Sequence, residues 1–341
     1  MRSFTSMTKI SIKDVARRAG CSNATASYAL NDSGRVAKQT REKVLKAANE
    51  LGFIPDHSAI RLRTGRSNLI GAIINDINNP FFAELVSEFE VEAWNAGFLT
   101  VLATSQDDPE RQRHIIESMV SQGVAGVVIS PVHGSDVDVL RPFRQRSIPY
   151  LVCVRDIDDK DAGLVAADDF RAGVIAGRHA LAMGHRRIAF VGGYEHTATW
   201  QRRVAGIHEA IVESGRESVT VDVYPGSEGP EYGAKVVHSL VGNDAAPTLI
   251  VGLNDDTAIG AYLAARELGL GIGRQLSVIG FDNIPQSASL SPAMTTVELF
   301  PRTMGRRCAE QLTRILGGGQ NEAEAIKISP VLVERGSVAQ L

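Results

Sequence analysis

Long hydrophobic runs and cysteines are scarce in this sequence of 341 residues. No apolar run reaches the roughly 18 residues that a membrane-spanning helix needs. The N-terminal MRSFTSM lacks the apolar stretch of a secretory signal, so we expect a cytoplasmic protein. Only Cys21, Cys153 and Cys308 are present, far apart and without metal-ligand spacing. They predict buried free thiols, no metal and no cofactor.

Catalytic groupings are missing as well. An enzyme needs a nucleophile with its base, an acid–base pair or a metal cluster, but the histidines of this chain are scattered. His185 lies in Gly-His-Arg-Arg-Ile ahead of a predicted strand, which is typical of a structural turn. The three glycines at 317–319 follow a predicted helix and do not have the spacing of a phosphate-binding loop. We therefore predict that the protein is not an enzyme.

Positive charge is concentrated at one end of the chain. Residues 1–66 contain 13 Lys and Arg against 5 Asp and Glu, a net charge of +8, whereas the remainder has a net charge of -11. A basic head on an acidic body indicates nucleic-acid binding by that head. The alternative is a basic disordered tail, but the head has the apolar spacing of helices.

Three short helices are predicted in the head. Ser11 can cap a first helix from Ile12, with Asp14 completing a capping box, and Gly20 ends it. Ser22 can cap a second helix over 23–30, so the pair forms a helix–turn–helix. A third helix is predicted over 39–51, although Ala37 is a weak cap for it. The segment 58–63 is too short to be stable alone and would fold only against a partner or DNA.

The rest of the sequence alternates strands with helices. Strands are predicted over 69–74, 100–104, 126–130, 150–154, 188–192, 219–224, 248–253 and 277–281, with helices over 81–96, 109–122 and 137–145 among the first four. This alternation indicates parallel sheets covered by helices on both faces, and its restart after 154 indicates two doubly wound α/β lobes. Ligands of such folds bind at the carboxyl ends of the strands, so the site is expected between the lobes.

The head resembles the lactose repressor/purine repressor (LacI) family without a gap from 12 to 55. The matching segments are 12–16, 19–22, 25–27, 30–31, 40–44 and 51–55. The alternative, an accidental helical bundle, does not explain this order and spacing. The resemblance implies a helix–turn–helix DNA-binding domain over 8–56, a hinge helix and linker over 57–67, and an effector-binding and dimerisation domain over 68–341.

The resemblance also assigns DNA contacts. Asn23, Ala24 and Tyr28 match positions that read base edges: Asn pairs with adenine and Ala meets a thymine methyl, while Tyr28 is less usual and can contact the backbone instead. The positions that touch phosphates are Ser22, Ser27, Asn31 and Thr40. Leu62, flanked by Ala59 and Arg63, matches the side chain that wedges into the minor groove and kinks the duplex.

The body resembles the type I periplasmic-binding-protein fold that the same family has. The matching segments are 79–82, 107–110, 123–128, 184–188, 203–206, 280–282 and 295–297. The likeness implies a first lobe over about 68–167 and 299–329 and a second over about 168–298 and 330–341. It places the chain crossings near Asp168, Glu298 and Pro330.

By position, the effector would meet Phe81, Phe82, Asp169, Arg203, Asn254 and Asp282. An Arg and an Asp that face one ligand suit vicinal hydroxyls. Arg203 or Asp282 can instead form an interlobe salt bridge, and one of the two phenylalanines can face the core. Many relatives have a ligand-stacking aromatic after the strand that ends at Tyr224, where this chain has Gly226-Ser227-Glu228-Gly229.

Trp200 could replace that aromatic as a stacking face, or it could be a lid or simple packing. We therefore expect a sugar or sugar derivative as effector, with a purine or nucleoside as the alternative. The expected protein is an allosteric transcription regulator, a repressor that binds pseudo-palindromic operator DNA as a homodimer. The end of the chain at Leu341 without a heptad repeat favours a dimer over a tetramer. A free-standing solute-binding protein is the remote alternative, and the predicted head argues against it.

Overall fold

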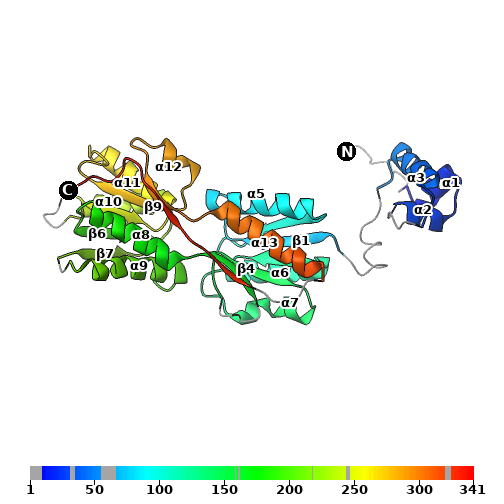
Figure 1. The fold of residues 1–341 in the computed structure, drawn as a ribbon, viewed down its shortest axis with the longest axis horizontal. Coiled ribbons are helices and arrows are strands. Elements are labelled where there is room, and N and C mark those ends of the chain that lie inside the picture. Colours follow the sequence, from blue (N-terminus) through cyan, green and yellow to red (C-terminus); the bar gives the residue numbers. More distant parts are fainter. Residues whose placement is uncertain are drawn as a thin grey trace, which may run out of the picture. The chain divides into compact units, whose positions relative to one another are not determined.

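The computed structural model describes residues 10–30, 35–54, 67–157, 159, 162–216, 218–242, 246–318 and 324–341. The chain divides into two units, Met1–Ser67 and Asn68–Leu341, which are shown in Figure 1. Asn31 and the predicted hinge residues Ala59, Leu62 and Arg63 lie outside the described residues. No helix of the described ranges is long and apolar enough to cross a membrane.

The N-terminal unit contains the three predicted helices, α1 (Ile12–Ala19), α2 (Asn23–Leu30) and α3 (Lys38–Leu51). Their apolar faces meet in one small core around Val15, Ala26 and Val44. Arg18 of α1 also pairs with Glu50 of α3, at 2.6 Å between Nη2 and Oε2. The helices are confirmed, and α3 begins one residue earlier than predicted.

Local capping determines where these helices begin and end. The backbone N–H of Ser11 donates to Asp14 Oδ2 at 3.0 Å, and hydrogen bonds from Ser11 lower the pKa of that carboxyl. Gly20 adopts a left-handed φ of 67°, which a glycine tolerates, and so closes α1. Ser22 Oγ then accepts from the Thr25 N–H at 3.1 Å, so α2 begins directly after the turn.

The larger unit contains two six-stranded sheets, each the centre of one lobe. The first lobe has the order β11-β5-β4-β3-β1-β2 and the second β12-β10-β9-β8-β6-β7. All pairings are parallel except β10 with β12. The strands are β1 (Leu69–Ile74), β2 (Leu99–Thr104), β3 (Gly126–Ile129), β4 (Tyr150–Cys153), β5 (Gly163–Ala167), β6 (Arg187–Val191), β7 (Thr220–Tyr224), β8 (Leu249–Gly252), β9 (Ser277–Phe281), β10 (Thr295–Glu298), β11 (Ala325–Ile328) and β12 (Val331–Val333).

Helices cover both faces of each sheet. In the first lobe α5 (Pro80–Asn95) packs beside α13 (Pro301–Leu316) on one face, and α6 (Pro109–Gln122), the 3₁₀ turn η1 (Val137–Leu140) and α7 (Arg141–Gln145) cover the other. In the second lobe α8 (Asp169–Ala182) packs on α9 (Ala198–Ser214), opposite α10 (Pro230–Leu240) and α11 (Asp255–Glu267). The short α12 (Pro285–Ser289) follows β9. Neighbouring residues of a strand therefore enter different cores, as Ile73 and Ile74 do.

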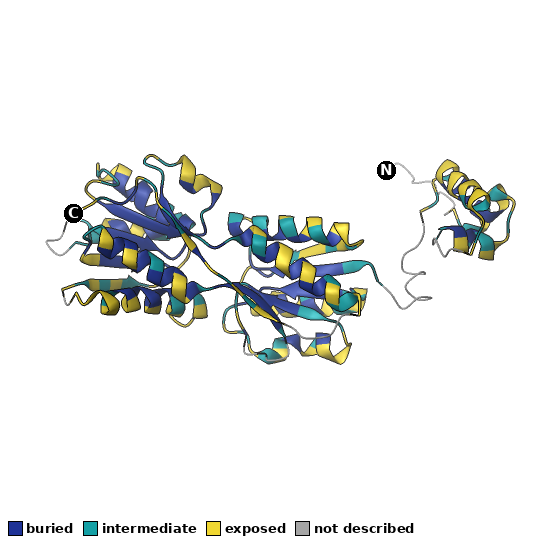
Figure 2. Cartoon of the chain, viewed as in Figure 1, coloured by how far each residue is buried: buried dark blue, intermediate teal, exposed yellow. Residues whose placement is uncertain are grey.

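These layers confirm the predicted fold class of a helical head and two doubly wound lobes. The central strands are almost fully buried (Figure 2), as expected for parallel sheets between helices. The chain passes between the lobes three times, at 167–169, 298–301 and 328–331. Cys153 and Cys308 are buried and free as predicted, whereas the free Cys21 is partly exposed.

Asp255 holds the second lobe together at the carboxyl edge of its sheet. It is fully buried, and its carboxylate accepts from the Ile284 N–H at 2.9 Å, the Thr296 hydroxyl at 2.6 Å and the Ser287 hydroxyl. These bonds join α11 to β10 and to the segment after β9. Burial nevertheless dominates and raises the pKa of Asp255 to about 7.

This raised pKa makes the stability of the protein depend on pH. The native state keeps a proton that the unfolded chain has already released near pH 4, so stability should fall as pH rises from about 4 to about 7. The contribution of this one group is on the order of 4 kcal/mol. Asp255→Asn should flatten the curve in this window, as measured by urea unfolding between pH 4.5 and 8. An unaltered pH dependence in the variant would contradict the assignment.

Candidate functional site

A cleft between the two lobes gathers most of the polar side chains expected to bind an effector. Its inner part is a narrow cavity of about 60 Å³, and the adjoining outer part has a volume of about 530 Å³, within the range of small-molecule sites. The described residues that line it are Asn79, Phe81, Phe82, His133, Val154, Arg155, Ala167, Asp169, Thr197, Thr199, Arg203, Glu228, Leu253, Asn254, Asp282, Leu299 and Met304. They come from the carboxyl ends of strands in both sheets, or from the helices that follow.

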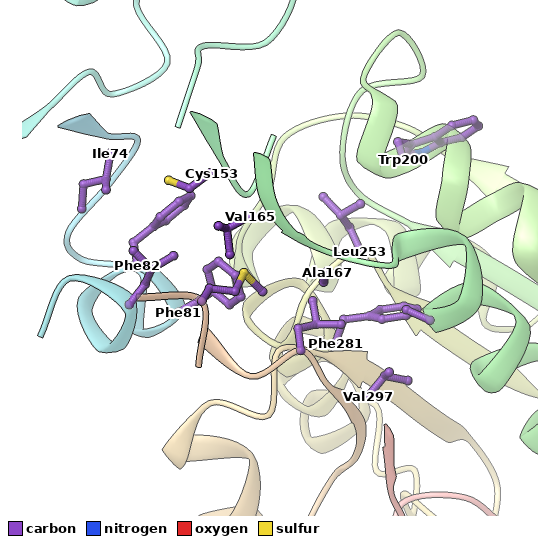
Figure 3. Packing of buried hydrophobic residues seen from close by; sticks show 14 of the residues in the cluster. Ile74, Phe81, Phe82, Cys153, Val165, Ala167, Trp200, Leu253, Phe281 and Val297 are labelled. Atoms are coloured by element: carbon purple, nitrogen blue, oxygen red, sulfur yellow. The ribbon is translucent and has the colours of Figure 1, made fainter. Parts of the chain in front are cut away.

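The first lobe provides the apolar wall. Asn79 caps α5 by accepting from the Phe81 N–H at 2.9 Å, which fixes the start of the helix. Phe81 and Phe82 then pack edge to face, with ring centroids 5.4 Å apart. Both rings line the cleft, and both also pack in the core of the lobe (Figure 3). Each phenylalanine can therefore contact a ligand and contribute to the core at the same time.

Arg203 is the central polar group of the second lobe. Its Nε donates to Asp169 Oδ1 at 2.9 Å, and its Nη1 donates to the carbonyl of Leu253. The guanidinium also lies 4.5 Å from the ring centroid of Phe281, a cation–π contact. The ion pair of Arg203 is thus with Asp169 at the start of α8 and does not join the lobes.

Asp282 occupies a strained turn directly after β9. Its φ is 100° and that of Asn283 is 56°, a conformation that non-glycine residues rarely adopt. The turn is held because Asn283 bonds Glu298 and Arg335, at 2.7 and 2.6 Å. Asp282 is 8% exposed, and no hydrogen bond from another described residue reaches its carboxylate. Burial therefore raises its pKa, and a ligand with donors would satisfy it.

Three ionisable residues of the inner cleft were not among the predicted effector contacts: His133, Arg155 and Glu228. Arg155 forms a two-pronged pair with Asp107, with 3.1 Å between Nη2 and Oδ2. His133 lies 4.0 Å from Glu228 across the cleft, and burial together with Arg155 lowers the His133 pKa to about 4. His133 and Arg155 follow the predicted strands that became β3 and β4, so the rule that ligands bind at carboxyl ends of strands was the available signal.

The structure does not bring Trp200 into the cleft. It is buried in α9, packs edge to face on Phe190 at 6.0 Å, and is absent from the lining residues. Figure 3 shows it well away from Phe81 and Phe82. Trp200 precedes Arg203 by three residues in α9, so the two side chains lie on nearly the same face of the helix. Trp200 is one turn nearer the start of α9, where the sheet covers it. The described cleft therefore has no stacking aromatic from this position.

In the head, α2 presents a polar surface to solvent. Ser22, Asn23, Ala24 and Tyr28 are exposed, while Ala26 and Ala29 on the opposite side are buried. Ser27 and Thr40 are half-buried. Arg35 lies over the ring of Tyr28, 5.5 Å from its centroid, and adds a positive charge beside this surface. The arrangement suits a helix that enters the major groove.

Two family descriptions match successive parts of the chain. Residues 11–56 match "Bacterial regulatory proteins, lacI family", and residues 67–335 match "Periplasmic binding proteins and sugar binding domain of LacI family". The chain belongs to the LacI family. The regulators of this family are DNA-binding proteins, and this chain has both of its characteristic parts.

Individual LacI-family proteins are similar over nearly the whole chain. The HTH-type transcriptional repressor PurR of Klebsiella pneumoniae is 31% identical, covering 96% of each chain. A regulator from Enterococcus faecium, solved with bound ribose, is 26% identical with a TM-score of 0.74 over 80% of this chain and 99% of its own. The lac repressor dimer bound to operator has the same fold, with a TM-score of 0.86 at 24% identity over 97% and 100% of the two chains.

Two ion pairs between α8 and α9 allow a matched test of how Arg203 is held. Asp169–Arg203 has side chains 7% and 7% exposed, whereas Arg178–Glu213 has side chains 59% and 43% exposed. Asp169→Asn leaves a buried charge without its counter-charge and should lower the free energy of unfolding by about 3 kcal/mol. Glu213→Gln should cost less than about 1 kcal/mol. Both values come from urea unfolding, and equal losses would show that burial does not distinguish the pairs.

Proposed function

We propose that this protein is a transcriptional repressor whose operator affinity is controlled by a sugar or sugar derivative bound between its lobes. The observation that supports this most is that Asp282, which no donor of the described residues reaches, lines one cleft with Arg203 and the two phenylalanines. Planar charged groups that each bind two oxygens beside an apolar wall suit a polyol. The ribose in the Enterococcus faecium regulator supports the same ligand class.

A purine or nucleoside is the second candidate, because several relatives are named PurR. A flat base is best held by an aromatic ring stacked on its face. Among the described lining residues the inner aromatic rings are those of Phe81 and Phe82, which meet each other edge to face. This geometry favours the sugar. A thermal-shift panel of sugars, bases and nucleosides distinguishes the two.

The head is proposed to read DNA through α2. Asn23, Ala24 and Tyr28 are proposed to read base edges, while Ser22, Ser27, Asn31 and Thr40 are proposed to touch phosphates. Ala59, Leu62 and Arg63 are proposed to enter the minor groove at the operator centre. Ligand closure of the lobes would alter the spacing of two such hinges in a dimer. Coupling of this type is reciprocal and amounts to about 1–3 kcal/mol.

Two variants should test ligand binding in the cleft and operator binding by the hinge separately. Asp282→Ala should keep operator binding but lose its response to ligand, because the ligand loses a buried acceptor. Leu62→Ala should weaken operator binding at least roughly tenfold and leave ligand binding unchanged. Gel shifts on a duplex selected from random sequences measure the first effect, and calorimetry measures ligand affinity. An Asp282→Ala protein that still responds would refute the cleft, and full operator affinity in Leu62→Ala would refute the hinge.

A homodimer is proposed through the first lobe. Edge strand β2 and neighbouring α5 expose an apolar surface made of Val91, Trp94, Leu99, Val101 and Leu102, of which Trp94 is 62% exposed. An edge strand with exposed apolar side chains is open to association unless another chain covers it. The lac repressor, similar in fold, was solved as a dimer. Two heads on such a dimer would read the two halves of a pseudo-palindrome.

Sedimentation equilibrium tests this surface. Leu102→Glu places like charges across the two-fold axis and should raise the dimer dissociation constant at least about tenfold. The control is Val212→Glu, since Val212 is an equally apolar residue that is 74% exposed on α9 of the second lobe. A Leu102→Glu protein that stays as dimeric as the control would place the interface elsewhere.

A further inference from the structure

Both rims of the cleft are acidic. Its outer part, which shares Phe82, His133 and Asn254 with the inner part, is lined on the first lobe by Asp76 and Asp107. The second lobe adds Glu228 and Asp256 to the same lining. Arg155 and His133 are the cationic or titratable bases among the described lining residues. Four carboxylates therefore surround an opening into which few positive charges point.

The positive charges nearby are already bonded to carboxylates. Arg155 is paired with Asp107, and deeper in the cleft Arg203 is paired with Asp169. His133 is neutral at physiological pH because its pKa is lowered to about 4. Glu228 has the amide of Asn254 at 3.5 Å and the neutral His133 at 4.0 Å, so no bonded cation compensates it. Asp282 at the inner end lacks a donor altogether among the described residues.

The like charges oppose each other across the cleft. Asp76 of the first lobe helps to raise the pKa of Asp256 on the second, after burial as the main cause. Burial is also the main cause of the raised pKa of Glu228, on which Asp107 and Asp256 act in the same direction while Arg155 and Arg203 oppose them. Bringing the lobes together without a counter-charge would therefore increase repulsion in a region that is losing water. An anionic ligand such as a sugar phosphate would add to that repulsion.

We propose that the effector carries a protonated amino group, which lies between the two acidic rims while hydroxyl groups of the same molecule bind Asp282 at the inner end. The inference rests on the proposed function, because it names the ligand class of that cleft. An amino sugar is the simplest compound with both features. Its ammonium lies in the field of the two rims, with Asp76 on one lobe and Glu228 and Asp256 on the other, and its charge favours closure because it offsets the repulsion between them.

A metal ion is the other cation that could bridge the rims. Among the described residues no group of three or more His, Cys, Asp and Glu side chains lies close enough to hold one. The four carboxylates are spread over a wide opening, which an organic ligand can span by its own length. The observations therefore favour the amine, and divalent cations form a separate arm of the test.

Calorimetry on the full-length protein at pH 7 and low salt tests the proposal with matched ligands. D-Glucosamine and D-galactosamine are compared with D-glucose and D-galactose, from which they differ by an ammonium in place of a hydroxyl. At least one amino sugar should bind about tenfold or more tightly than its parent. The 6-phosphates and N-acetyl derivatives of the two amino sugars should not bind more tightly than the parent sugars. MgCl₂ or CaCl₂ alone should give no heat of binding.

Protein variants show whether the acidic rim causes the preference. Glu228→Gln combined with Asp256→Asn should reduce the ratio of amino-sugar affinity to parent-sugar affinity to less than about threefold, and this ratio is the readout because both residues line the cleft. Glu209→Gln removes an exposed carboxylate from α9 outside the cleft and is the matched control, so it should retain the full preference.

Every other result overturns the proposal. If the neutral parents bind as well as the amino sugars, or the preference survives the double variant, the amine claim is wrong while the sugar cleft stands. Binding of the divalent cations alone, lost in the double variant, would assign the rims to a metal. If no compound of the panel binds, the amine claim fails. The proposed repressor function then depends separately on sequence-selective DNA binding in gel shifts.

Discussion

The buried guanidinium of Arg203 is the group on which the cleft depends. It bonds the start of α8 through Asp169 and the end of β8 through the Leu253 carbonyl, and it lies over Phe281 at the end of β9. α8 and α9 reach this geometry because glycines face each other between them: a Cβ on Gly173 would lie 2.1 Å from the Arg203 carbonyl oxygen, and one on Gly206 would lie 2.1 Å from that of Phe170. Close packing of two helices thus holds one charge, and that charge positions three elements around the ligand site.

Two destabilising features lie at the carboxyl edge of the sheet in the second lobe. Asp255 is fully buried, and Asp282 combines burial with a left-handed backbone. A strained, buried carboxylate persists only where its surroundings over-determine it. Here Asn283, held by Glu298 and Arg335, fixes the turn, and Asp255 ties the following segment to α11. The two aspartates differ in one respect. Three hydrogen-bond donors of the protein satisfy the carboxylate of Asp255, whereas no donor among the described residues reaches that of Asp282, so a ligand could provide one.

The sequence predicted the order of layers better than it predicted side-chain directions. Strands β1 and β9 and helix α6 have the predicted bounds, because hydrophobic period and capping residues are local signals. Phe81, Phe82, Asp169, Arg203, Asn254 and Asp282 do line one cleft, since each lies at a strand end or a helix start. Trp200 does not line the cleft. It lies one turn before Arg203 in α9, where its side chain packs on Phe190 of β6. His133 and Arg155 were missed because loop residues show no periodicity.

Control of DNA binding by a ligand requires that the ligand bind two arrangements of the lobes unequally. The lobes are joined by three chain crossings, and one hydrophobic cluster runs from Phe81 and Phe82 of the first lobe to Leu253 and Phe281 of the second, so relative rotation changes contacts at the cleft. Across the cleft His133 faces Glu228 at 4.0 Å and Arg202 donates to Asp156 at 3.0 Å, whereas Asp76 and Asp256 are like charges on opposite rims. Repulsion between them favours separation in the absence of ligand. An effector with the proposed ammonium would remove this repulsion, and it would shift the equilibrium only as far as it binds the closed arrangement more tightly than the open one.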